Sequence, residues 1–168
     1  MKKGFIRAAV LAVVIAICFS LSACSGSSLG MKRVIGKPSS EAITALESIV
    51  GKDLTLYGEG ELDPDGIVYK ASDDSLIPVL STGFTAVELL LDSSGNVETV
   101  QFYVSYSRDT EFMTLSTQLQ DYYNDDFTYS NNYGLRKYVW KDTPDGDVAI
   151  KVTEPIFKLV FSDYIAAY

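Results

Sequence analysis

Two segments of the chain place apolar residues three or four positions apart, which is the spacing of one face of an amphipathic helix. The first follows residues 38–41 (PSSE), a typical helix start with a proline and an acid, and it stops at Gly51. Its apolar positions are Ile43, Leu46, Ile49 and Val50. The second begins at residues 109–111 (DTE) and ends at residues 124–126 (NDD). Its apolar positions are Phe112, Leu115, Leu119 and Tyr122. We predict one helix in each segment, with the apolar positions facing the core.

Six further segments have the apolar and β-branched composition of strands: 67–71, 86–91, 97–106, 135–141, 148–153 and 156–164. Pro144-Asp145-Gly146 separates the fourth from the fifth and predicts a hairpin, because proline presets φ and glycine accepts a positive φ. The last segment alternates only in part, which is typical of a central strand covered on both faces.

The order helix, strand, strand, strand occurs twice, starting at Pro38 and about 71 residues later at Asp109. One helix on three strands buries little apolar surface, so the two units are expected to join edge to edge. The predicted fold class is α+β: two α-β-β-β units form one antiparallel sheet with two helices on one face, in a single domain over residues 38–168. This order resembles the tandem α–β units of β-lactamase-inhibitor-protein-like domains.

Residues 1–23 have the organisation of a secretory signal peptide. Three basic residues precede an uncharged apolar run over residues 8–21, and the small residues Ser22 and Ala23 follow. A membrane-spanning helix needs about 20 apolar residues, so a cleaved signal is favoured over a permanent span.

Leu21-Ser22-Ala23-Cys24 resembles the lipobox of bacterial lipoprotein precursors. The resemblance implies that the signal is cut before Cys24 and that the Cys24 thiol is the site of lipid attachment. Two acyl chains provide stable anchoring, since each buried CH₂ contributes about 0.8 kcal/mol. We therefore expect a protein anchored to the cell membrane on its extracytoplasmic side, with residues 24–37 as a flexible tether. The alternative is a plain signal peptide with an incidental cysteine.

The charge of the expected mature chain excludes one class of partner. Three of the 14 basic residues lie in the signal, which leaves 11 against 22 acidic residues and a formal charge of −11. Nucleic-acid binding requires a basic surface, so we expect no nucleic-acid partner.

The residue inventory also argues against most catalysis. The chain has no histidine, and its second cysteine, Cys18, lies within the signal. Catalytic Ser–His and Cys–His pairs and His-rich zinc sites are therefore excluded. The acidic turns at 63–66 and 142–147 lack the spacing of an EF-hand, so we predict no metal and no cofactor. A carboxylate-based glycan hydrolase stays open as a remote alternative.

One tyrosine-rich segment, residues 121–134, has the composition of an adaptable binding surface. Tyr122 continues the apolar stripe of the second helix and is assigned to the core. Tyr123, Tyr129 and Tyr133 are the candidate binding surface. The alternative is that these aromatic rings simply cover the sheet.

The combined prediction is a membrane-anchored extracytoplasmic lipoprotein, a non-catalytic binding module for an envelope protein or glycan. The alternative of a different class is a structural or assembly lipoprotein of an envelope complex, whose binding face is permanently occupied.

Replacing Cys24 with Ala should leave an unprocessed, unacylated precursor, because the thiol that accepts the lipid is gone. Metabolic labelling with radioactive palmitate, followed by immunoprecipitation, measures this directly. Label that survives the change would contradict the assignment of Cys24, since Cys18 is the one other thiol.

Overall fold

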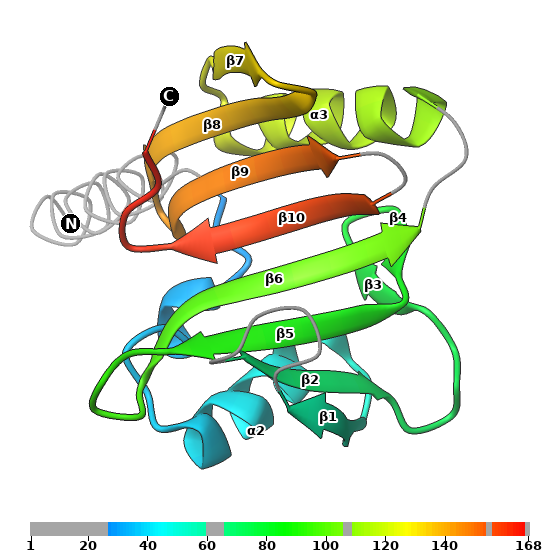
Figure 1. The fold of residues 1–168 in the computed structure, drawn as a ribbon, viewed down its shortest axis with the longest axis vertical. Helices are drawn as coiled ribbons and strands as arrows, with labels where there is room; N and C mark the ends of the chain where they lie inside the picture. The colour runs from blue at the N-terminus through cyan, green and yellow to red at the C-terminus, as the bar shows by residue number, and fades with distance from the viewer. Residues whose placement is uncertain (1–26, 60–65, 106–108, 154–155, 167–168) are drawn as a thin grey trace, which may run out of the picture.

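The computed structural model describes residues 27–59, 66–105, 109–153 and 156–166. Cys24 and the predicted signal lie outside the described residues. The secondary structure is α+β, with a large antiparallel sheet and two α-helices (Figure 1).

The main sheet has eight strands in the order β1-β2-β5-β6-β10-β9-β8-β7, and every neighbouring pair is antiparallel. Its first half contains β1 (Leu54–Glu59), β2 (Gly66–Ala71), β5 (Ala86–Leu91) and β6 (Val97–Ser105). Its second half contains β7 (Thr128–Asn132), β8 (Leu135–Thr143), β9 (Gly146–Thr153) and β10 (Ile156–Ser162). A separate hairpin joins β3 (Ile77–Val79) to β4 (Thr82–Phe84).

All six predicted strand segments are strands in the structure, and β10 occupies the predicted central position between β6 and β9. The number of strands per half is larger than predicted, because each helix is followed by four strands of the sheet instead of three. The additional strands β1 and β7 form the two edges. Edge strands pair on one side only, so their formation depends on the neighbouring strand more than on their own apolar pattern.

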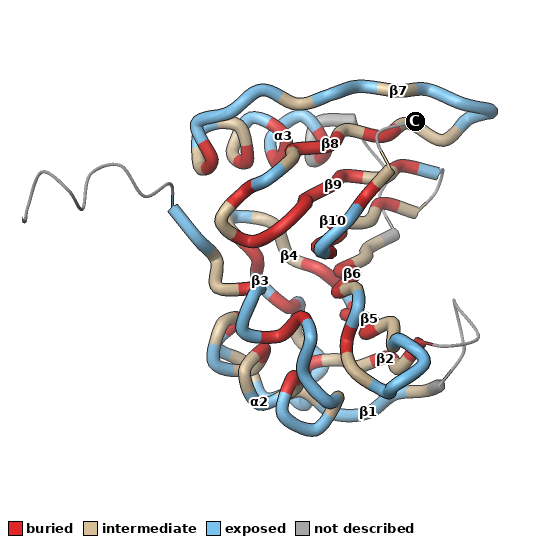
Figure 2. Tube along the Cα trace, turned by 90° about the vertical axis from the view of Figure 1, so that its left-hand side faces the viewer, coloured by how far each residue is buried: buried red, intermediate tan, exposed pale blue. Residues whose placement is uncertain are grey.

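The helices α2 (Ser39–Val50) and α3 (Asp109–Tyr123) lie on the same face of the sheet, as Figures 1 and 2 show. Helix α2 ends at Gly51, which has a φ of 66° and donates its N–H to the Glu47 carbonyl at 2.8 Å. The predicted core residues Leu46, Leu115 and Leu119 are fully buried. Within the described residues, no helix combines the length and apolar character needed to cross a membrane.

The β3–β4 hairpin belongs to the helix face as well (Figures 1 and 2). Phe84 of β4 is fully buried, and its ring centroid lies 5.6 Å from that of Phe102 in β6 and 6.0 Å from that of Phe157 in β10. These contacts join both halves of the sheet to one core.

Residues 28–37, which were predicted to be the distal part of a flexible tether, instead pack against the domain. The short 3₁₀ helix η2 (Met31–Arg33) and the residues after it bury Met31 and Val34 completely. The Gly36 N–H donates to the Val97 carbonyl at 2.7 Å, and the Val97 N–H donates to the Lys37 carbonyl at 2.8 Å. The folded domain therefore begins about ten residues before the predicted boundary at residue 38.

Truncating Leu115 to Ala should lower the free energy of unfolding by about 2–5 kcal/mol, because the change removes buried methyl groups and leaves a cavity. Met113 lies two residues away on the same helix and is 58% exposed, so Met113→Ala is a matched control with an expected change within about 0.5 kcal/mol. Equal effects of the two changes, measured by urea unfolding of the full-length chain, would contradict the assignment of the core face.

Candidate functional site

The face of the sheet opposite the helices holds a groove of about 610 Å³. Successive side chains of a strand point to opposite faces of the sheet, so every second residue of the central strands faces the side that holds this groove. In β10, Phe157, Leu159 and Phe161 point into the core, whereas Lys158, Val160 and Ser162 line the groove. The polar lining also includes Thr99, Gln101, Lys137, Lys151, Thr153 and Tyr164.

Three lysines of the groove face one another across adjacent strands. Lys151 of β9 pairs in register with Lys137 of β8 on one side and with Lys158 of β10 on the other. Neighbouring strands are about 4.8 Å apart, and like charges directly opposite each other destabilise a sheet. Burial, followed by the charges of Lys137 and Lys158, lowers the pKa of the Lys151 ammonium below its usual value. We call this row Lys137–Lys151–Lys158 the lysine row.

Two lysines of the lysine row donate hydrogen bonds to neutral oxygen atoms. The Lys158 ammonium donates to Gln101 Oε1 at 3.4 Å, and the Lys137 ammonium donates to the Ala166 carbonyl. Gln101 Nε2 in turn donates to the fully buried Glu88 carboxylate at 3.4 Å, so this acid sits behind Gln101. In the described part of the chain, no carboxylate lies within ion-pair distance of Lys151 or Lys158.

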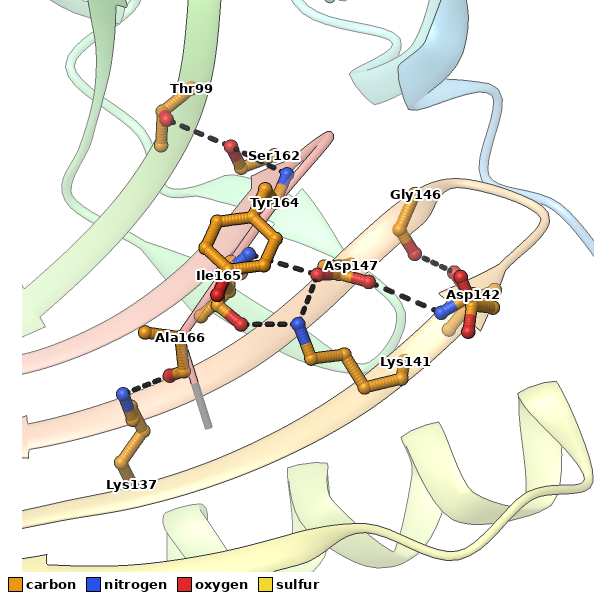
Figure 3. Close-up of polar contacts among 11 residues, drawn as sticks. Thr99, Lys137, Lys141, Asp142, Gly146, Asp147, Ser162, Tyr164, Ile165 and Ala166 are labelled. Carbon is orange, nitrogen blue, oxygen red and sulfur yellow. Dashed lines mark hydrogen bonds and ion pairs between the residues drawn. The ribbon is translucent and has the colours of Figure 1, made fainter. Parts of the chain in front are cut away.

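The segment after β10 folds back over the sheet and forms one wall of the groove (Figure 3). The Ile165 N–H donates to Asp147 Oδ2 at 2.8 Å, and the Lys141 ammonium binds both Asp147 and the Ile165 carbonyl. Burial acts to raise the pKa of Asp147, but the hydrogen bonds from Lys141 and the amides of Ile165 and Asp142 together lower it. The Tyr164 ring covers the Lys141 ammonium at 4.6 Å.

A small apolar cluster beneath this segment completes the wall. Ile165 packs with Val139, Ala149 and Val160, which belong to three adjacent strands. The wall is therefore fixed by both apolar burial and ion pairing.

The prediction that Tyr123 belongs to a binding surface is wrong. Its side chain is 7% exposed and belongs to the core. The physical reason is its position four residues after Leu119, which places it on the buried stripe of α3. Tyr122, which was assigned to the core, is half-buried and packs against that core.

Tyr129 and Tyr133 are both exposed. Tyr129 lies on the edge strand β7, where its ring centroid is 4.8 Å from that of Tyr138. Tyr133 and Gly134 form the two-residue turn between β7 and β8, with φ values of 53° and 85°. Neither tyrosine lines the groove, so the structure separates the predicted surface from it.

The structure confirms the predicted hairpin at Pro144-Asp145-Gly146, which joins β8 to β9. Within this turn, Asp145 holds the N-terminal segment against the hairpin. Its fully buried carboxylate accepts hydrogen bonds from the Tyr123 hydroxyl at 2.9 Å and from the Ser28 hydroxyl at 2.8 Å. The amides of Leu29, Gly30 and Met31 donate to the same carboxylate. Because all of these donors converge on the Asp145 carboxylate, the acidic turn has a structural role.

The lysine row was not predicted from the sequence. Each lysine does stand inside a predicted strand, and Lys151 and Lys158 have apolar neighbours on both sides, which is an unusual place for a charge. However, the three lysines lie on three consecutive strands, and only the strand register places them opposite one another.

The chain matches no family model, no curated protein and no solved structure. Among the described residues, no group of three or more acidic, cysteine or histidine side chains is arranged to hold a metal ion.

Replacing Asp145 with Asn should lower the free energy of unfolding by roughly 2–4 kcal/mol. The NH₂ group of asparagine would replace one acceptor oxygen, so some of the N–H donors around it would lose their acceptor. Urea unfolding of the full-length chain measures the change. Asp163 is exposed and close to the same hairpin, so Asp163→Asn is the control and should leave stability unchanged. An equally stable Asp145→Asn protein would show that these hydrogen bonds do not hold the N-terminal segment.

Proposed function

We propose that the protein is a lipid-anchored extracytoplasmic lipoprotein, and that its domain is a non-catalytic binding module whose ligand site is the groove. The observation that carries this proposal is the contrast between the two faces of the sheet. The helix face is filled by the core, whereas the opposite face holds a half-enclosed groove with charged, polar and apolar side chains. Such a mixture is typical of ligand sites.

The lining of the groove supports binding over catalysis. Glycoside hydrolysis needs a pair of carboxyl groups on either side of the scissile bond. Among the described residues, the side chains that line the groove include no Asp and no Glu. Asp147 lies beside the groove, but its carboxylate is occupied by Lys141 and by backbone amides.

The proposed anchor would hold the domain close to the bilayer. Ser28 already contacts the domain through Asp145, and it lies four positions after Cys24 in the chain. Four residues extend over at most about 14 Å, given about 3.5 Å per residue. Each half contributes one α-helix and four strands of the main sheet, which further supports our proposal that the domain consists of tandem α–β units, as in β-lactamase-inhibitor-protein-like domains.

Hydrogen exchange tests the groove as the ligand site. Full-length protein in detergent is exchanged with and without an extract of its own cell envelope, and peptides are analysed by mass spectrometry. We expect slower exchange in residues 135–143 and 156–166, because a bound ligand stabilises the state that binds it. Slower exchange confined to residues 121–134 would instead indicate a surface around Tyr129 and Tyr133.

A blocking variant makes the same test specific. Thr153 is exposed and lines the groove, so Thr153→Trp should remove the protection by filling the site. Thr55 is an exposed position of the edge strand β1 outside the groove, so Thr55→Trp is the matched control and should keep the protection. Absence of protection in the unmodified protein would contradict the proposed function.

A further inference from the structure

We propose that the groove binds a ligand with two or more phosphate groups, and that the ammonium groups of the lysine row hold these phosphates. This inference rests on the proposed function, because it names the class of ligand for the same groove. It is carried by the arrangement of the three lysines and by the groups that surround them.

The first argument is the cost of the arrangement. Three ammonium groups on adjacent strands repel one another, and Lys151, in the middle of the row, is flanked by the other two. Among the described residues, no carboxylate compensates Lys151 or Lys158. Uncompensated like charges in a half-buried site are expected where a ligand of opposite charge completes the arrangement.

The second argument is the location of the charge. The mature chain expected from the sequence has a formal charge of −11, so a random surface of this protein would be acidic. The lysine row instead concentrates three of its basic residues in one groove, and Glu88, the nearest acid in register, is separated from Lys158 by Gln101.

The third argument distinguishes phosphate from carboxylate. A carboxylate is best matched by the planar fork of arginine, whereas lysine binds phosphate as a point charge. The described lining of the groove contains three lysines and no arginine, and Arg136 of β8 points to the other face, over the Phe112 ring. One phosphate monoester carries about −1.5 to −2 charges, so three ammonium groups match two phosphates better than one.

Isothermal titration calorimetry of the full-length protein in neutral detergent tests the inference, with sodium tripolyphosphate as the probe. We expect binding by the unmodified protein and about 10- to 100-fold weaker binding by Lys151→Met, since a charge-assisted hydrogen bond is lost. Lys37 is exposed outside the groove, so Lys37→Met is the matched control and should change the affinity less than twofold. Equal weakening by both changes would show general electrostatic attraction and overturn the site.

The same variants give a second readout without ligand. Lys151→Met removes a repelled charge and keeps the length of the side chain, so the melting temperature should rise by about 2–4 °C. A fall in melting temperature would show that Lys151 has a structural role and would overturn the inference.

A water-soluble lipid with one phosphate, dihexanoyl phosphatidylglycerol, tests the other source of phosphate. Weaker binding than tripolyphosphate supports a ligand with several phosphates, and tighter binding overturns it in favour of a lipid headgroup. The failures of the two proposals are distinguishable. If the envelope extract protects the groove but tripolyphosphate does not bind, only the phosphate inference is overturned. If tripolyphosphate binds but the extract gives no protection, only the proposed role of the groove in the envelope is overturned.

Discussion

The pairing of β6 with β10 is the interaction on which the rest of the structure depends. It joins two four-stranded halves into one sheet over seven pairs of residues, from Ile156 with Ser105 to Ser162 with Thr99. The pairing places Phe102 and Phe161 side by side on the helix face, with ring centroids 6.1 Å apart. On the opposite face it places Gln101 beside Val160 and brings Lys158 next to Tyr103. The core and the groove are therefore two consequences of one register.

The β8–β9 hairpin couples the two ends of the described chain to this sheet. Asp145 in its turn accepts the amides of the N-terminal segment, and Asp147, two residues later, accepts the amide of Ile165 near the C-terminus. Gly146 between them has a φ of 92°, and a Cβ atom there would lie 2.7 Å from the Ser162 carbonyl oxygen. A glycine is thus required both by the backbone conformation and by the close approach of β10.

The lysine row shows how the groove differs from an ordinary solvent-exposed sheet face. Along a strand of such a sheet, polar residues that face solvent usually alternate with apolar residues that face the core. Charged residues on the solvent face usually lie opposite residues of the other charge on the next strand. Here both cross-strand neighbours of Lys151 are cationic, and the segment with Tyr164 and Ile165 forms a wall of the groove that holds them. The free energy that this arrangement costs the unliganded protein is the physical basis for regarding the groove as a binding site.

The sequence by itself determined the local structure well. Helix starts and stops, the six central strand segments and the Pro144-Asp145-Gly146 turn depend on local periodicity and on the backbone preferences of proline and glycine. The burial of Leu46, Leu115 and Leu119 follows from the same periodicity. By contrast, the polar edge strand β7, the packing of Met31 against the core and the burial of Tyr123 depend on neighbours distant in the chain.

The candidate site could be decided only by the tertiary structure. Alternation in each strand specifies which residues share a face with Lys137, Lys151 or Lys158, but it does not specify which residue of the next strand lies opposite. A register shift of one residue would turn each lysine's neighbour to the other face, and local sequence contains no measure of that shift. The lysine row exists because the core residues on the helix face select one register, and the groove receives the charges that this register places there.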